Sequence, residues 1–130
     1  MISPLHHVDC VRISVPELDR ALIFYHDKLG YEVVWKDEHK IGLLMEDGKT
    51  EIVLQDDGET TTDLKVSSVE DTIDFWVKSG GNLLSGPIDI PIGKWAMIQD
   101  PWGNQFSILD STKGIFVTDK DNNIIGMKKE

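Results

Sequence analysis

The chain has 130 residues, of which 40% are hydrophobic and 28% charged, and its formal net charge is −10 at pH 7. These values are ordinary for one globular domain that buries a core. The negative charge disfavours nucleic acids and anionic membranes as partners, and no apolar run is long enough to cross a bilayer. The single cysteine, Cys10, excludes a disulfide framework. Together with the lack of a signal-peptide pattern, it predicts a reducing, cytoplasmic setting.

The segment from Asp9 to Val34 predicts a strand, a helix and a second strand with short connections. Apolar residues alternate with polar ones from Val11 to Val15, which is typical of a strand with one apolar face. Pro16 suits the first turn of a helix, and Gly30 suits its C-terminal cap. The apolar stripe expected on this helix consists of Leu18, Ala21, Leu22, Tyr25 and Leu29.

A hairpin and a linker are expected next. The Asp47-Gly48 pair separates two apolar runs and is a strong hairpin signal. The stretch DDGETTTD, residues 56–63, is polar, acidic and without periodicity. It is therefore the predicted linker between two halves of the chain.

The same order of elements restarts in the second half. Leu64 and Val66 alternate with polar residues, as in a strand, and Ser67 with Glu70 has the pattern of a capping box at a helix start. Gly80-Gly81 is expected to end this second helix.

Three more strands and a tail complete the second half. A short strand is expected to begin at Asn82, followed by a Pro/Gly loop over residues 86–93. The segments KWAMIQ and QFSILD predict strands on either side of the DPWGN turn, where Trp102 either covers a strand end or packs on a ligand or a second subunit. The tail, residues 111–130, predicts a hairpin-like extension without a counterpart in the first half.

The two halves match each other at an offset of 51 residues. The matched pairs are Ile13 with Leu64, Val15 with Val66, Leu22 with Ile73, Phe24-Tyr25 with Phe75-Trp76, and Gly30 with Gly81. The chain therefore predicts two tandem βαβββ units, residues 5–55 and 61–110, each burying its sheet against its own helix.

These paired units resemble the vicinal oxygen chelate superfamily, which includes glyoxalase I, extradiol dioxygenases, and fosfomycin and bleomycin resistance proteins. The motifs that carry the resemblance are ISVPELDRALIFYHDKLGYEVV and MIQDPWGNQFSIL, and it extends from Leu5 to Asp110. It implies an α+β fold, the glyoxalase/bleomycin resistance fold, in which two βαβββ units form a curved mixed sheet with helices outside. The whole chain, residues 1–130, would be one such domain, with 111–130 as its extension.

The resemblance also implies a site on the sheet face that the helices leave uncovered. Strand alternation then predicts which side chains point there. The ligand-binding candidates are Cys10, Arg12, Glu51, Val53, Gln55, Trp95, Met97, Gln99, Gln105 and Ser107. Ser14, Thr61, Asp63, Lys65 and Leu109 share the same predicted face. A solvated face would explain the charged residues but not Trp95, Met97 and Leu109, so we expect a small-molecule cavity.

Enzymes of this superfamily hold a divalent metal with four residues from the first and last strands of the two halves. The corresponding positions here are Cys10, Val53, Thr61 and Ser107. Val53 has no donor atom, Thr61 and Ser107 are weak donors, and Cys10 alone does not make a site. We therefore expect no metal cofactor, which argues against glyoxalase, dioxygenase and fosfomycin-transferase chemistry.

No catalytic residue is assigned from the sequence. Arg12 would favour the thiolate form of Cys10, but no histidine is placed to act as its base, and a lone buried cysteine usually serves as a small hydrophobe. Arg12 itself is expected to pair with Glu51, with Asp63 or with a ligand carboxylate.

Three functions remain open at this point. The leading hypothesis is a metal-independent, homodimeric protein of the bleomycin-resistance type that sequesters a small molecule without transforming it. The alternative is a lyase, isomerase or dioxygenase with a non-standard metal site. A third is a structural or regulatory domain whose cavity is filled by its own side chains.

Overall fold

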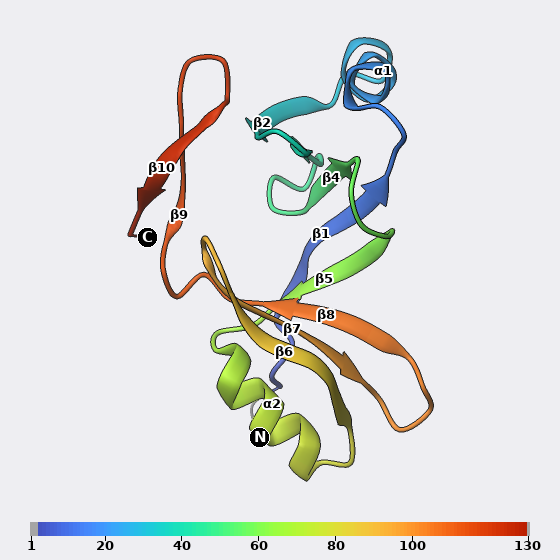
Figure 1. Ribbon diagram of the computed structural model, residues 1–130, viewed down its shortest axis with the longest axis vertical. Coiled ribbons are helices and arrows are strands. Elements are labelled where there is room, and N and C mark those ends of the chain that lie inside the picture. Colours follow the sequence, from blue (N-terminus) through green and yellow to red (C-terminus); the bar gives the residue numbers. More distant parts are fainter. Residues whose placement is uncertain (1–2, 130) are drawn as a thin grey trace. The chain divides into compact units, whose positions relative to one another are not determined.

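The computed structural model describes residues 3–129, which form two compact units (Figure 1). The first unit consists of Asp9–Thr61 and Phe116–Gly126, and the second consists of Thr62–Ile115 with the described residues before Asp9 and after Gly126. The predicted domain range, 1–130, also includes residues 1, 2 and 130, which lie outside the described residues.

The first unit has a four-stranded mixed sheet. Its elements are β1 (His7–Ser14), the α-helix α1 (Leu18–Leu22), the π-helix η1 (Ile23–Lys28), β2 (Glu32–Lys36), β3 (Lys40–Leu44) and β4 (Glu51–Gln55). The strand order is β2-β3-β4-β1, in which β1 runs parallel to β4 and the other neighbours are antiparallel. The parallel pair is the consequence of the helical crossover between β1 and β2.

The helical segment of this unit covers one face of its sheet. The buried side chains below it are Ile41, Leu43, Ile52 and Leu54. The predicted stripe packs on them except for Leu29, which is 52% exposed, so this part of the prediction is wrong. The reason is the π-helical turn: the N–H of Leu29 bonds to the carbonyl of Phe24, five residues back, and the wider turn rotates Leu29 off the stripe.

The second unit repeats this plan. Its elements are β5 (Thr61–Lys65), α2 (Val69–Lys78), β6 (Asn82–Ile90), β7 (Gly93–Gln99) and β8 (Gln105–Leu109). The strand order is β5-β8-β7-β6, with β5 parallel to β8. Helix α2 packs on a core of Val66, Val69, Ala96, Ile98 and Ile108.

Two local predictions for the second unit are corrected by the structure. The N-cap of α2 is Ser68, whose hydroxyl accepts the N–H of Asp71, and not Ser67. The expected loop over residues 86–93 is largely strand, because β6 continues to Ile90. Since β6 is the edge strand of its sheet, Pro87 can lie within it without breaking an interior ladder.

The C-terminal extension forms a hairpin of β9 (Ile115–Thr118) and β10 (Ile124–Lys128). Its turn contacts β2, the edge strand of the first unit: the N–H of Lys36 donates to the carbonyl of Asn122 at 2.7 Å. The ring of Phe116 also packs on Trp35, with 5.4 Å between ring centroids. The extension thus covers a sheet edge that would otherwise be open. No helix within residues 3–129 is long and apolar enough to cross a membrane.

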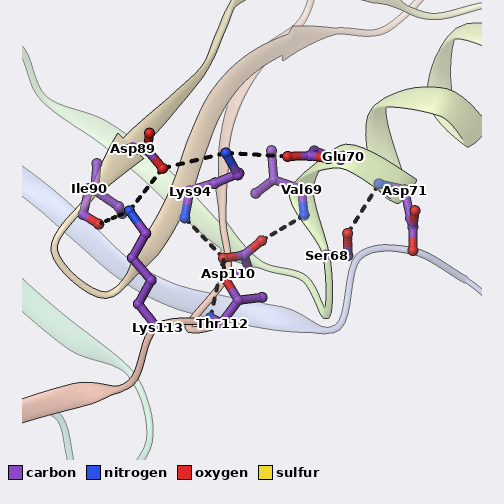
Figure 2. Close-up of polar contacts among 10 residues, drawn as sticks. All are labelled: Ser68, Val69, Glu70, Asp71, Asp89, Ile90, Lys94, Asp110, Thr112 and Lys113. Atoms are coloured by element: carbon purple, nitrogen blue, oxygen red, sulfur yellow. Dashed lines mark hydrogen bonds and ion pairs between the residues drawn. The ribbon is translucent and has the colours of Figure 1, made fainter. Parts of the chain in front are cut away.

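A buried carboxylate joins three elements of the second unit (Figure 2). Asp110, directly after β8, is 2% exposed. Its Oδ2 accepts the N–H of Val69 at the start of α2 at 2.8 Å, and its Oδ1 accepts the N–H of Lys94 in β7 at 2.9 Å. Thr112 adds its hydroxyl at 2.9 Å. A Cβ at Gly93 would lie 2.2 Å from Oδ1, so only glycine leaves room for this carboxylate.

The protonation of Asp110 reflects two opposing effects. Burial alone would raise its pKa, but the hydrogen bonds from Val69, Lys94 and Thr112 stabilise the charged form and hold the pKa below its ordinary value. A group whose pKa is lowered by folding stabilises the fold above its unfolded pKa. That stabilisation is lost as the pH falls through the folded pKa.

Replacing Asp110 by asparagine should therefore destabilise the protein by about 3 kcal/mol near neutral pH, because charge-assisted hydrogen bonds to buried donors are lost. Urea unfolding measures this difference. It should shrink as the pH falls below about 4, because the wild-type carboxyl group then also becomes neutral.

Asp56 offers the matched control, since it follows β4 as Asp110 follows β8. The backbone N–H of Asp56 donates to the carbonyl of His39, and that of Asp110 donates to the carbonyl of Lys94. Asp56 is exposed, and its side chain binds the His39 ring at 2.8 Å. Asp56→Asn should cost much less stability. Equal losses in the two variants would contradict the role given to Asp110.

Candidate functional site

Each unit has one sheet face that its own helix does not cover, called here its helix-free face. In the first unit, Ile52 and Leu54 pack under the helix, so the alternate residues of β4 point to the helix-free face. The same alternation applies to β1, where Ile13 packs on the core. Five predicted site residues therefore share this face: Cys10, Arg12, Glu51, Val53 and Gln55.

The register of β1 and β4 arranges these residues in rows. Cys10 pairs with Glu51, and Arg12 pairs with Val53. Val53 and Cys10 are both buried. Gln55 is also buried, and its amide donates to the carbonyl of Glu59 at 2.8 Å. The Gln55 side chain therefore holds the segment that follows β4.

A tryptophan-carboxylate pair on this face was not found from the sequence. The Trp35 indole N–H donates to Oε1 of Glu51 at 2.7 Å. The indole lies across Gly42, which pairs with Trp35 in the ladder, and a Cβ at Gly42 would lie 2.1 Å from the indole nitrogen. The available signal was a glycine inside an apolar strand, which often marks a close approach of another group.

The helix-free face of the second unit carries the other five predicted site residues. Ala96 and Ile98 of β7 face α2, so Trp95, Met97 and Gln99 point to the opposite face. The ladder pairs Met97 with Ser107 and Gln99 with Gln105. Ser107 is fully buried, and its hydroxyl contacts the Met97 sulfur at 4.0 Å.

Trp95 has a buried indole N–H that lacks a hydrogen-bond acceptor among the described residues. The other enclosed indoles are satisfied: that of Trp35 binds Glu51, and that of Trp76 donates to the carbonyl of Gln99 at 2.8 Å. Trp102, in the DPWGN turn, is 83% exposed, so it does not cover a strand end. An unpaired buried donor is costly, so the Trp95 indole N–H is an exception among the enclosed indoles of the described residues.

Three of the four positions that the family resemblance assigns to a metal ion have unfavourable donors or surroundings. Val53 offers only carbon atoms, Ser107 is fully enclosed beside a thioether, and Cys10 is buried in its sheet. Within the described part of the chain, no three His, Cys, Asp or Glu side chains are grouped so that they could share a metal ion.

Gly42→Ala should displace the Trp35 indole from Glu51, because the added methyl group would overlap the ring. We expect a loss of about 1–3 kcal/mol in the free energy of unfolding and a shifted indole N–H resonance for Trp35. Gly126→Ala is the control, since a Cβ there meets nothing within 4 Å. An unchanged Trp35 resonance in Gly42→Ala would contradict the arrangement.

Comparisons with known proteins agree with this architecture. A family model described as a glyoxalase-like domain matches residues 10–109. A comparison with curated protein sequences finds no significant match.

Solved structures with a similar fold include enzymes of different activity. Methylmalonyl-CoA epimerase from Mycobacterium tuberculosis has a TM-score of 0.72 and 18% identity, over 86% of this chain and 92% of that one. A variant of the Streptomyces coelicolor epimerase, in complex with 2-nitronate-propionyl-CoA, has a TM-score of 0.66 and 17% identity, over 83% and 99%. An extradiol ring-cleaving dioxygenase from B. fuscum has a TM-score of 0.59 and 20% identity, over 85% and 34%.

At such identities these similarities establish the fold and not the activity. They confirm the predicted α+β class and the resemblance to the vicinal oxygen chelate superfamily. With the family model matching most of its length, the chain belongs to the glyoxalase-like domain family.

Proposed function

We propose that this glyoxalase-fold protein binds a small molecule without a metal ion and sequesters it, as proteins of the bleomycin-resistance type do. The observation that carries the proposal is the Trp95 side chain. It is partly buried on the helix-free face of the second unit, and its enclosed N–H lacks an acceptor among the described residues. Such a group costs stability in the free protein, and a ligand gains it as a partner when the side chains that enclose it move apart.

The composition of the two helix-free faces supports this proposal. Trp95 and Met97 are partly buried and offer aromatic and apolar surface, and Gln99 and Gln105 offer amide groups at its end. A mostly apolar surface with a few polar groups is typical of small-molecule sites. In the first unit, Arg12 and the Trp35–Glu51 pair add charged and polar groups on the corresponding face.

Independence from metal rests on donor chemistry. Val53 cannot ligate an ion, and the remaining family positions carry a buried cysteine and two hydroxyls. The structurally similar epimerases include one described in complex with methylmalonyl-CoA, so proteins of this fold hold small organic molecules. The alternative function is that of an enzyme with a non-standard metal site, and the test below distinguishes the two.

The test combines metal analysis with ligand screening. Protein purified without chelator or metal-affinity resin should contain well below one equivalent of zinc, nickel, manganese or iron per chain by mass spectrometry, and incubation with these ions should not change this. Small molecules from a chemically diverse library should quench tryptophan fluorescence equally with and without EDTA. Cys10→Ala should leave both results unchanged.

Stoichiometric metal that is lost in Cys10→Ala, together with chelator-sensitive turnover, would replace the proposal by the enzyme alternative. If the protein is folded and no compound in the library quenches its tryptophan fluorescence, the result would favour a structural domain. Trp102→Phe is the matched fluorescence control, because the exposed Trp102 ring should not report on a ligand held beside Trp95.

We also propose that the protein is a cytoplasmic homodimer. The dimer is supported by β6, an edge strand whose exposed apolar residues include Leu84 and Ile88. Ile88→Lys should convert the dimer to a monomer in sedimentation velocity, whereas Ile125→Lys, at another exposed isoleucine on β10, should not. A wild-type protein that sediments as a monomer at micromolar concentration would rule out the dimer.

A further inference from the structure

We infer that the C-terminal hairpin, β9 with β10, is a strap that opens and closes over the helix-free face of the first unit. In the closed form, the ring of Phe116 lies on the Trp35 indole and holds the place of an aromatic group of a ligand. The proposed function rests on Trp95 in the second unit and does not depend on this strap.

Trp35 lies on the helix-free face because β2 changes register just before it. Val33 pairs with Leu43 and packs with it in the core, whereas Trp35 pairs with Gly42. Since Leu43 faces the helix, Gly42 faces away from it, and the indole fills the space beside Gly42. The indole N–H donates to Glu51 of the same face. The ring is therefore an aromatic surface on this face.

Phe116 of β9 covers this aromatic surface. The centroids of the Phe116 and Trp35 rings are 5.4 Å apart, with an angle of 50° between the ring planes. Both side chains are partly buried. Contacts of this kind between two aromatic rings are favourable, and a ligand ring would gain the same contact. The position is filled in the closed form, so a ligand ring reaches it only after Phe116 moves away.

The hairpin is fixed at its base. The N–H of Lys113 donates to the Ile92 carbonyl at 2.9 Å, and its ammonium group donates to Asp89 at 2.8 Å. Gly114 is buried, and any side chain there would collide with the carbonyl of Lys128 at the end of β10. These contacts hold the base in place when the turn of the hairpin moves.

The rest of the hairpin is held loosely. Its strands form a two-stranded sheet of their own, and none of the described residues from 115 to 128 is buried, apart from backbone pairing. Among residues 3–129, one backbone hydrogen bond joins the turn to β2, from the Lys36 N–H to the Asn122 carbonyl at 2.7 Å. A two-stranded hairpin with little buried surface is only marginally stable, and such segments open at a low free energy. The turn therefore leaves β2 before the sheet of the first unit unfolds.

The turn itself is well organised, so it moves as one piece. Oδ1 of Asp119 accepts the N–H groups of Asp121 at 2.8 Å and Asn123 at 3.0 Å. The N–H of Asp119 also donates to the Asn123 carbonyl at 2.9 Å. Together these bonds present the Asn122 carbonyl to Lys36, and they are kept when the strap opens.

Hydrogen exchange in ¹⁵N-labelled full-length protein tests the opening. After correction for intrinsic rates, the Lys36 amide should exchange at least about tenfold faster than that of Leu54, a buried residue of the interior strand β4. Low urea concentrations should leave the Lys36 rate nearly unchanged, because the opening exposes little surface. A Lys36 amide that exchanges as slowly as that of Leu54 would overturn the strap.

Two variants of the hairpin separate the aromatic contact from other effects. Phe116→Ala should raise the exchange rate of the Lys36 amide about threefold to tenfold, because one aromatic contact no longer opposes the opening. Ile125→Ala, at a side chain of β10 that is 64% exposed, is the matched control and should leave the rate unchanged. Equal effects of the two variants would contradict the role given to Phe116.

The place held by Phe116 is tested with benzyl alcohol, which resembles its side chain. Trp35→Phe assigns the Trp35 indole resonance. In Phe116→Ala, millimolar benzyl alcohol should shift this resonance at least about fivefold more than in the wild type, because the competing ring is gone. Cyclohexylmethanol, a similar molecule without the aromatic ring, should shift it less.

A disulfide can lock the strap. Lys36 and Asn123 are bridge partners, so cysteines at both positions should join the turn to β2 when oxidised. Benzyl alcohol should then shift the Trp35 resonance in the reduced form and not in the oxidised form. Equal shifts in both forms, or no shift in Phe116→Ala, would overturn the strap. The proposed function is decided separately, by the library screen and metal analysis.

Discussion

The second unit depends on the buried carboxylate of Asp110. It accepts backbone N–H groups from the start of α2 and from β7, and it lies directly after β8. One side chain thus ties the helix to two strands and satisfies donors that would otherwise be buried without partners. Its negative charge at a helix N-terminus is also favourable electrostatically. Gly93 belongs to the same arrangement, because any side chain there would collide with the carboxylate.

The first unit reaches the same topology with different local chemistry. Asp56, at the position equivalent to Asp110, is exposed and binds the ring of His39, whose pKa it raises by hydrogen bonding and by its charge. Within the described chain, the N-terminus of α1 receives no side-chain cap, and its helix continues as a π-helix. The core below it, from β3 and β4, supplies most of what holds this helical segment. The repeat is therefore one of topology and apolar pattern, while the polar anchors differ.

The candidate site follows from how the two sheets use their helix-free faces. On the first, the Trp35 indole lies flat across Gly42 and is held by Glu51, and Phe116 from the extension packs against it. On the second, Trp95 is also partly buried but keeps an N–H without an acceptor in the described structure. One indole N–H is thus satisfied, whereas the other is enclosed without a partner in the described structure.

The βαβββ repeat, the family resemblance and the face to which each strand residue points could all be predicted before the structure was known. Side-chain alternation in a strand and the apolar stripe of a helix are local and periodic, so Trp95, Met97 and Ser107 could be assigned to one face without a structure. The contacts made across the strands, in contrast, could be seen only in the folded protein. The indole of Trp35 reaching Glu51 over Gly42, the π-turn that exposes Leu29 and the burial of Asp110 all depend on register and packing between segments distant in the chain. Such contacts leave no periodic signal, because each is a single meeting of side chains that the folded sheet brings together.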